Sequence, residues 1–478
     1  MQGLLRGRAF SSVHRNRWAL QTRVPRTTLP RSLKYGLPHR YNSNSAVAPN
    51  TTPIEKLILD HVKAAGPISH ATYMQFCLGH PEEGYYMSPK NPIFGPKGDF
   101  VTSPEISQLF GEMIAVWLFS QWLGAGSPES LRLVELGPGR GTLMADILHT
   151  FKQLFTSRKV NPNVEIHLVE NSETLRGLQR QKLSDFGHEL QWHDSINTIS
   201  KSTTQYTMLV AHEFFDALPV HILMKSEQGW RELQVGSSEI VSEAYLESWY
   251  KLQVACKNER PHLLSFFHAE PTPVATVLGN SSPRFSTVSK GAHLEVSPAA
   301  FKIAYKVGEL LSRKESEDDV QGLGGCGLII DYGSSDPPLN TIRAFKDHKQ
   351  VHPLHRPGEC DLTGNVDFGY LKEAMQDLVP VYPPIEQGVF LQHMGLSSRL
   401  RSLAQNTAEL SAEEAQERYN RLLQGATRLA DPREMGSQYK FLGISSNSNT
   451  EDGAHVYPFG IGAEGTGDEV TSQPRARD

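Results

Sequence analysis

The residues best suited to chemistry form a glycine-rich turn between an apolar segment and an amphipathic one. Residues 131–148 read LRLVELGPGRGTLMADIL, with glycines at Gly137, Gly139 and Gly141. Glycine adopts positive φ angles and has no Cβ, so a ligand can approach such a backbone closely. A turn that joins a strand to a helix in an open α/β sheet lies at the carboxyl end of the strand, where ligands bind. The sequence therefore predicts a binding loop; a strand-to-helix turn without a ligand is the alternative.

The spacing of these glycines distinguishes between nucleotide-type ligands. A dinucleotide-binding turn reads GxGxxG, and its third glycine lets the helix pack closely. This chain has Thr142 at that position and reads GxGxG instead. Glu135, just before the loop, would repel a pyrophosphate. The pattern disfavours a nicotinamide-dependent oxidoreductase and resembles the first motif of class I methyltransferases. That resemblance implies that the loop receives the methionine part of S-adenosylmethionine, whose sulfonium and ammonium groups a nearby carboxylate attracts.

Two further acids fit the same ligand. VEIHLVE predicts a second strand that ends in Glu170, and a carboxylate at that place binds ribose hydroxyls in nucleotide-binding folds. LQWHDSI supplies Asp194 as an acceptor for the adenine amino group. For either acid, an ordinary surface position is the alternative interpretation. The residues predicted to bind S-adenosylmethionine are Glu135, Gly137, Gly139, Gly141, Glu170 and Asp194.

The elements that must position these residues follow from the hydrophobic pattern. Short apolar segments at 131–136, 164–170, 206–213 and 326–333 are predicted to be strands, and helical patterns separate them. Alternation of this kind indicates a mostly parallel sheet that helices cover on both faces. The predicted fold class is therefore α/β, with a Rossmann-like class I methyltransferase core.

Capping patterns locate the other helices. Residues 52–55 (TPIE) predict the start of a helix, and a second helix is expected after Ser69. Ser103 is predicted to cap a third helix. Near the C-terminus, 411–414 (SAEE) form the pattern of a capping box, and 438–445 (QYKFLGIS) predict a final strand.

The chain divides into segments of different composition. We expect a presequence, an N-terminal helical and loop region, a core divided by a β-rich insertion, and a flexible tail. The boundaries are 1–45 for the presequence, 46–125 for the N-terminal region, 126–217 for the first part of the core, 218–290 for the insertion, 291–445 for the remainder of the core with C-terminal helices, and 446–478 for the tail.

The first segment has the composition of a mitochondrial address. Residues 1–54 hold nine arginines and lysines and no acid, although the whole chain has a net charge of −5. An Arg-rich, Ser-rich, acid-free start predicts a presequence and a mature protein in the mitochondrial matrix; a basic nucleic-acid-binding arm is the alternative. Four scattered cysteines suit a reducing compartment. No segment approaches the roughly 18 apolar residues that a membrane-spanning helix needs, so we expect no membrane insertion.

Six segments together resemble the MidA family of mitochondrial and bacterial methyltransferase-fold proteins, over roughly residues 50–445. They are GDFVTSPEISQLFGEMIAVWL (98–118), LVELGPGRGTLMADIL (133–148), HEFFDALPVH (212–221), LIIDYG (328–333), PGECDLTGNVDF (357–368) and MGSQYKFLGIS (435–445). The resemblance implies an enzyme that symmetrically dimethylates an arginine of the 49-kDa-type NADH dehydrogenase subunit during complex I assembly. One departure is His212, where the family commonly has asparagine.

The implied reaction assigns roles to the acids after the fourth core strand. Guanidinium is protonated at physiological pH and is then a poor nucleophile, so carboxylates must align it and accept its proton. Glu213 is predicted to be the orienting catalytic carboxylate and Asp216 its partner, with a turn cap as the alternative for Asp216. Tyr85 and Tyr86 are candidates for cation–π contact with the arginine, or for loop packing. Residues 331–333 end the predicted strand 326–333; a simple β-turn is the preferred interpretation there, and a place in the lining of the acceptor cleft is the alternative.

Other ligands and functions are less well supported. No histidine or cysteine spacing indicates a metal site. The acidic chain beyond the presequence disfavours nucleic acid and fits a basic protein partner. The sequence leaves the oligomeric state open, a homodimer included. A non-catalytic chaperone with the same fold is the alternative to an enzyme, and the intact loop and paired acids favour the enzyme.

Overall fold

The computed structural model describes residues 51–88, 91, 101–237, 263–313, 322–405, 411–447 and 456–459. The predicted presequence, part of the β-rich insertion, most of the predicted tail and most of the charged residues 312–322 (SRKESEDDVQG) lie outside these residues. The fold is described for the remaining residues only.

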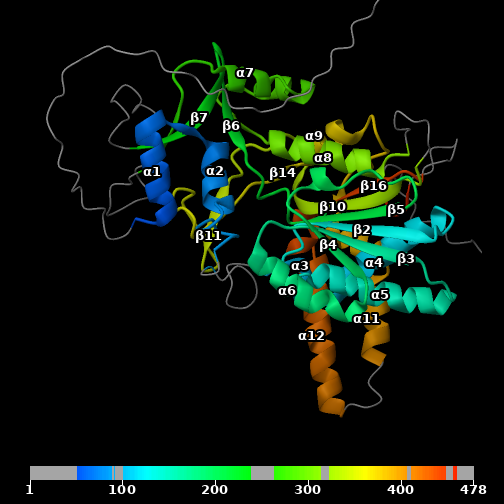
Figure 1. The fold of residues 1–478 in the computed structure, drawn as a ribbon. Helices are drawn as coiled ribbons and strands as arrows, with labels where there is room; N and C mark the ends of the chain where they lie inside the picture. The colour runs from blue at the N-terminus through cyan, green and yellow to red at the C-terminus, as the bar shows by residue number, and fades with distance from the viewer. Residues whose placement is uncertain are drawn as a thin grey trace, which may run out of the picture. The chain divides into compact units, whose positions relative to one another are not determined.

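The central feature is a mixed sheet with the strand order β4-β3-β2-β5-β10-β16-β15 (Figure 1). The strands from β4 to β10 are parallel to one another, whereas β16 is antiparallel to β10. The bounds are β2 Ser130–Leu136, β3 Asn163–Val169, β4 Glu189–His193, β5 Tyr206–His212, β10 Gly325–Ser334, β15 Ile385–Glu386 and β16 Tyr439–Ser445, with β14 Val366–Asp367 pairing with the end of β10. This sheet confirms the predicted α/β fold class.

Helices cover both faces of the sheet. Successive strand residues point to opposite sides, and apolar residues on each side have to be buried. In β2, Leu131 and Leu133 pack with one layer of helices, whereas Val134 and Leu136 pack with the other. Figure 1 shows the two layers on either side of the strands. The first contains α4 (Gln108–Gly124), α5 (Thr142–Arg158) and α6 (Glu173–Leu183), and the second α8 (Pro298–Leu311) and α9 (Phe368–Met375).

The predicted caps of three helices are confirmed. Thr52 caps α1 (Pro53–Ala65) by accepting a hydrogen bond from the Glu55 amide at 3.0 Å. Ser69, which with Ile68 forms β1 (Ile68–Ser69), caps α2 (His70–Gly79). The Ser411–Glu414 capping box begins α12 (Ala412–Ala430). These contacts are local, so the sequence is sufficient to predict them.

The predicted cap at Ser103 is wrong. A short helix, α3 (Ser103–Ile106), follows Thr102, and the chain then leaves helical geometry at Ser107 before α4 begins. The Ser107 hydroxyl accepts the hydrogen bond from the Leu109 amide at 3.3 Å. The Ser103 hydroxyl is buried and has no hydrogen-bond partner. Residues 103–124 form two helices because the backbone of Ser107 is extended and interrupts the helical geometry.

Two smaller antiparallel sheets lie beside the core. One has the order β1-β7-β6-β9, with β8 beside β7, so the insertion pairs with the N-terminal region and extends past residue 290. The other has the order β12-β11-β13 and was not predicted. The elements are β6 His221–Ser226, β7 Gly229–Ser237, β8 Leu263–Phe267, α7 Pro273–Gly279, η5 Pro283–Thr287, β9 His293–Val296, β11 Arg343–Lys346, β12 Lys349–Val351 and β13 Asp361–Thr363.

The C-terminal part of the chain packs on the first helix layer. Its further elements are α10 Gln387–His393, α11 Leu396–Gln405 and α13 Met435–Gln438. The core also contains two short turns, η1 Ser184–Phe186 and η2 Ile196–Thr198. Phe459, within the predicted flexible tail, is fully buried, and its ring lies 5.9 Å from that of Trp117. Phe459 is therefore anchored in the core, although it lies within the segment predicted to be a flexible tail.

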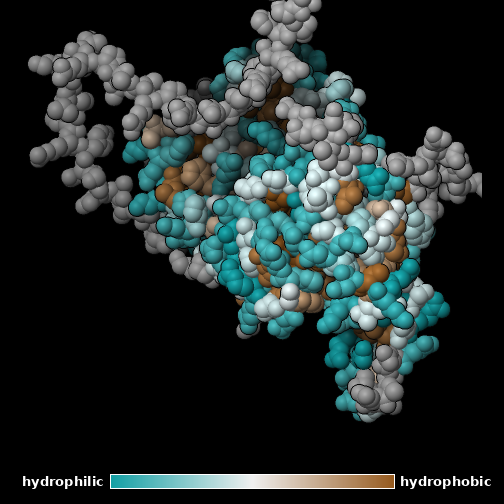
Figure 2. Space-filling model, turned by 45° about the vertical axis from the view of Figure 1, so that its right-hand side comes forward, coloured by the Kyte–Doolittle hydropathy of each residue, from teal (hydrophilic) through white to brown (hydrophobic). Residues whose placement is uncertain are grey.

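Within the described ranges, no helix is both long and apolar enough to cross a bilayer. The face in Figure 2 is mainly hydrophilic, and its hydrophobic residues form small separate patches. Patches of that size are ordinary for a folded protein surface.

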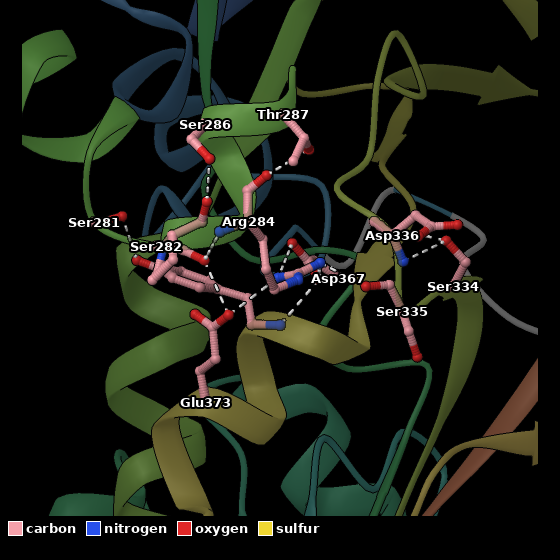
Figure 3. Close-up of polar contacts among 12 residues, drawn as sticks. Ser281, Ser282, Arg284, Ser286, Thr287, Ser334, Ser335, Asp336, Asp367 and Glu373 are labelled. Atoms are coloured by element: carbon pink, nitrogen blue, oxygen red, sulfur yellow. Dashed lines mark hydrogen bonds and ion pairs between the residues drawn. The ribbon is translucent and has the colours of Figure 1, made fainter.

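A partly buried ion pair joins the insertion to the segment that follows β13. Arg284 of η5 donates to both carboxylate oxygens of Asp367, at 2.8 and 3.2 Å, and lies 3.7 Å from Glu373 (Figure 3). Asp367 also caps α9 by accepting from the Tyr370 amide at 2.9 Å. Burial raises the pKa of Asp367 to about 6, and Arg284 opposes that rise. The pair therefore links η5 of the insertion to β14 and α9.

Replacing Arg284 by glutamine is expected to lower the free energy of unfolding by about 3 kcal/mol, because Asp367 then stays buried without its cation. Lys290→Gln is the matched control, since Lys290 and Glu227 form an exposed pair that contributes at most about 1 kcal/mol. Urea unfolding at neutral pH measures both variants. Equal losses in the two variants would contradict the role given to Arg284.

Candidate active site

A cleft of about 1420 Å³ lies at the carboxyl ends of the core strands. Residues that follow β2, β3 and β5 line it, together with the end of β10, the region around α3 and the β12-β11-β13 sheet. All of the predicted site residues line this cleft except Gly141. Gly141 instead precedes α5 at a φ of 77°, and a Cβ there would lie 3.5 Å from Gln179. Its role is therefore to make the turn into the helix.

The glycine loop has the backbone that its sequence predicts. Gly137 and Gly139 have φ angles of 64° and 51°, which residues with a side chain rarely adopt. A Cβ at Gly137 would lie 2.8 Å from the Phe214 ring. The Gln179 side chain donates to the Gly139 carbonyl at 2.7 Å and fixes the outer side of the loop. The loop is thus a narrow backbone surface along one wall of the cleft.

Glu135 is a buried acid without full hydrogen bonding. Its side chain is almost completely buried and its Oε2 atom has no hydrogen-bond partner. Burial, followed by the negative charge of Asp146, raises the pKa of Glu135 to about 8. A positively charged ligand group beside this oxygen would relieve the cost of burying it.

Glu170 and Asp194 lie farther along the same wall. Glu170 accepts hydrogen bonds from the Ser172 amide at 2.8 Å and from Gln179 at 3.3 Å, and burial raises its pKa. These bonds orient the carboxylate and leave lone pairs for a ligand. The Asp194 side chain is 82% exposed at the rim and forms an ion pair with Arg176. Glu170 is therefore an inner residue of the cleft, and Asp194 a rim residue.

Glu213 lies on the opposite side of the loop, directly after β5. Its φ angle is 48°, and its amide continues the sheet by donating to the Ile330 carbonyl at 3.0 Å. The Tyr439 hydroxyl and the Ser103 backbone lower the pKa of its carboxyl group, while Oε1 has no hydrogen-bond partner. Burial, and then the charge of Asp216, raise the pKa of Glu213 to about 8.

Asp216 faces the same space and is held by hydroxyl groups. Its Oδ2 atom accepts from Thr363 at 2.7 Å and from the Tyr332 hydroxyl, while Oδ1 has no hydrogen-bond partner. The backbone amides of Phe215 and Asp216 donate to fully buried Asp331. Asp216 is therefore more than the local turn cap considered above, because its partners come from β10 and β13.

His212 does not neutralise these acids. Its Nε2 atom lies 3.3 Å from Glu213 Oε1, yet the two atoms are not aligned for a hydrogen bond. Burial lowers the pKa of His212 to about 3, so the ring is neutral at physiological pH. Its ring packs against Phe110, with the two centroids 5.0 Å apart. His212 is thus an uncharged wall of the site.

Several site residues were missed or misinterpreted. Residues 331–333 form the end of β10 rather than a β-turn, and Tyr332 and Gly333 line the cleft. Tyr85 is fully buried, which fits the loop-packing alternative and not a contact with the arginine. Tyr86 lines the cleft, and its hydroxyl donates to Asp361 at 2.8 Å. Asp361 and Thr363 were not singled out. Their spacing of two residues, typical of one strand face, was the available signal.

The comparisons with known proteins agree with this geometry. A family model for S-adenosyl-L-methionine-dependent methyltransferases matches residues 113–383. The human protein "Protein arginine methyltransferase NDUFAF7, mitochondrial" is 33% identical over 87% of this chain and 88% of its own length. The zebrafish (Danio rerio) protein of that name is 36% identical over 83% of this chain and 88% of its own. The chain belongs to this methyltransferase family.

A solved structure shows the same fold. A COG1565 superfamily member from Burkholderia thailandensis, bound to S-adenosylhomocysteine, matches this methyltransferase with a TM-score of 0.61. It is 23% identical, and the match covers 83% of this chain and 92% of that one. The likeness concerns the fold, and the cofactor assignment comes from the family.

The cleft of this methyltransferase fits S-adenosylmethionine. The unpartnered Glu135 oxygen suits the ammonium group, and the backbone of Gly137 and Gly139 leaves room for the methionine part. Glu170 is placed for the ribose hydroxyls and Asp194, at the rim, for the adenine. These individual contacts remain predictions. Among the described residues, no group of three or more His, Cys, Asp or Glu side chains is arranged to hold a metal ion.

Replacing Gly139 by valine is expected to weaken S-adenosylmethionine binding at least tenfold. A β-branched residue at this φ costs roughly 1–3 kcal/mol, and its side chain also enters the cleft. Isothermal titration calorimetry measures the affinity. Gly177→Ala is the matched control, because a Cβ at that exposed glycine meets no atom within 4 Å. Unchanged binding by the Gly139 variant would rule out the loop as the donor site.

Proposed function

We propose that this methyltransferase acts on a protein arginine in the mitochondrial matrix, and that it symmetrically dimethylates an arginine of the 49-kDa-type NADH dehydrogenase subunit as complex I is assembled. The observation that supports an arginine most directly is a pair of buried carboxylate oxygens, Glu213 Oε1 and Asp216 Oδ1, which have no hydrogen-bond partner. The related proteins are named as mitochondrial arginine methyltransferases, which supports the same assignment.

A guanidinium group has the chemistry that these oxygens require. It is planar, stays charged at physiological pH and donates five hydrogen bonds in a fixed arrangement. Two carboxylates that turn oxygens towards one space can bind it on two edges. The cation would also lower the raised pKa of Glu213, since it favours the ionised form. Binding of arginine thus compensates the burial of both acids.

The residues of the chain have three tasks in the reaction. S-adenosylmethionine supplies an electrophilic methyl group when it is bound. Glu213 and Asp216 hold the guanidinium so that one terminal nitrogen faces that methyl, and ionic hydrogen bonds draw positive charge away from this nitrogen. Glu213 would accept the proton that this nitrogen loses when it is methylated, because its carboxylate lines the same cleft.

The composition of the chain supports the location and the partner. The acid-free, arginine-rich residues 1–45 are typical of a mitochondrial presequence. The rest of the chain is acidic, which attracts a basic, arginine-bearing segment of another protein.

Cells that lack this protein are expected to lose a symmetric dimethylarginine from the 49-kDa-type subunit, as mass spectrometry of purified mitochondria measures. The wild-type chain should restore the modification. Glu213→Gln should restore at most about 1% of the rate, because it removes the proton acceptor, and it should keep its affinity for S-adenosylmethionine. Glu417→Gln, at an exposed acid on α12, is the control.

The outcomes of this experiment are distinct. Restoration by Glu213→Gln would remove Glu213 from the mechanism. An asymmetric or a single methyl group would correct the type of product. A mitochondrial proteome that loses no methylarginine would contradict the proposed activity and favour a chaperone with this fold.

The pH dependence of the reaction is a further prediction of the proposed function. Because burial raises the pKa of Glu213 to about 8, this carboxyl is mostly protonated in the free enzyme at pH 7. A protonated acid cannot accept the guanidinium proton, so kcat/KM is expected to rise as pH rises through about 8 and then to level off. In the enzyme–substrate complex, the bound cation should lower the pKa of Glu213, so the rise of kcat with pH should occur at a lower pH than the rise of kcat/KM. Steady-state rates between pH 6.5 and 9.5 test this, and a kcat/KM that falls over this range would contradict it.

A further inference from the structure

A single buried side chain behind the cleft connects the two parts of the predicted donor site. Gln179 lies on α6 and is fully buried, and it is not among the residues that line the cleft. Its Nε2 atom donates to the Gly139 carbonyl at 2.7 Å and to Glu170 Oε2 at 3.3 Å. Gly139 and Glu170 both line the cleft. Gln179 therefore fixes the spacing between the glycine loop and the acid that is predicted to bind the ribose.

Trp192 determines which way the Gln179 amide points. The indole Nε1 atom of Trp192, in β4, donates to Gln179 Oε1 at 2.9 Å. An indole nitrogen is a donor only, so it requires the carbonyl end of the amide, and the amino end then faces Gly139 and Glu170. The Arg180 guanidinium lies over the Trp192 ring, 4.8 Å from its centroid. The orientation of the Gln179 amide is thus set by a ring that is itself held in place.

Glu170 is anchored through both of its carboxylate oxygens. Oε1 accepts from the Ser172 amide at 2.8 Å, and Oε2 accepts from Gln179. The main chain is fixed as well, because Arg176 Nε donates to the Glu170 carbonyl at 2.8 Å. A carboxylate oxygen has two lone pairs, so each oxygen keeps one for a ligand. Two acceptor atoms in fixed positions suit the two neighbouring hydroxyl groups of a ribose.

We propose that Gln179 is a positioning residue that couples the glycine loop to Glu170, so that tight binding of the methyl donor depends on the ribose hydroxyls. An amide satisfies all three partners, because the Gly139 carbonyl and the Glu170 carboxylate need donors whereas Trp192 needs an acceptor. A carboxylate at position 179 would repel Glu170, and an apolar side chain would leave buried polar groups unsatisfied. The inference rests on the predicted contact of Glu170 with the ribose and does not depend on which group accepts the methyl.

Binding of two donor analogues to the full chain tests this inference. The probes are S-adenosylhomocysteine and its 2′,3′-dideoxy analogue, which lacks the ribose hydroxyls, both titrated calorimetrically. The wild-type chain should bind S-adenosylhomocysteine at least about tenfold more tightly than the analogue. Gln179→Met keeps the length of the side chain without its hydrogen bonds, and it should weaken S-adenosylhomocysteine about tenfold but the analogue only about threefold. The ratio of the two affinities should therefore fall about threefold.

Two further variants separate positioning from folding. Gln181→Met makes the same substitution at an exposed position of α6 and should bind both ligands as the wild type does. Trp192→Phe releases the Gln179 amide but keeps a ring beside Arg180, and it should lower the ratio about twofold. Thermal unfolding shows whether each variant is folded, and Trp192→Phe decides the question if the Gln179 variant is not.

The inference is overturned if the wild-type chain binds both ligands equally, because Glu170 then makes no contact with the ribose. It is also overturned if the folded variants weaken both ligands by the same factor, as a general loss of structure would. The methylarginine of the mitochondrial subunit is a separate measurement, so the proposed function can fail without affecting this result.

Discussion

The burial of carboxyl groups at the carboxyl ends of parallel strands is the constraint on which this cleft depends. Glu135, Asp216 and Asp331 are buried there and Glu213 is largely buried, and desolvation is the main cause of the raised pKa of each. A buried acid persists only when hydrogen bonds or a cation compensate its lost hydration. In this chain the hydrogen bonds come from backbone amides and neutral hydroxyls, which leaves the positive charge to be supplied by the donor and the acceptor.

Asp331 is the acid that organises the others. It is fully buried in β10, and its carboxyl accepts from the amides of Phe215, Asp216 and Tyr332. These bonds hold the turn after β5, where Glu213 has a φ of 48°. A non-glycine residue in that conformation is strained, and it persists because its surroundings fix it. The position of the Glu213 carboxylate is therefore set by a neighbouring strand, and not by its own local sequence.

The sequence predicts the elements that depend on near neighbours. The periodicity of hydrophobic residues predicts the strands and helices of the core, and the capping residues predict the starts of α1, α2 and α12. The spacing of the glycines predicts the loop at Gly137 and Gly139. The failures have a common cause. The pairing of Tyr86 with Asp361 joins residues 275 positions apart, and the burial of Phe459 depends on Trp117. Contacts at that separation follow from tertiary packing, which no local pattern encodes.

The short helix α3 shows why the donor and acceptor sides of the cleft must be considered together. Its Ser103 backbone contacts the Glu213 carboxyl, and its Glu105 accepts from Thr142, the first residue of α5, at 2.7 Å. Arg140 of the glycine loop lies 3.6 Å from the same Glu105. One four-residue element thus contacts both the loop that fits the methyl donor and the acid proposed to orient the acceptor. Methyl transfer requires the reacting atoms to be aligned within fractions of an ångström, and a shared support keeps the two sides in register as ligands bind.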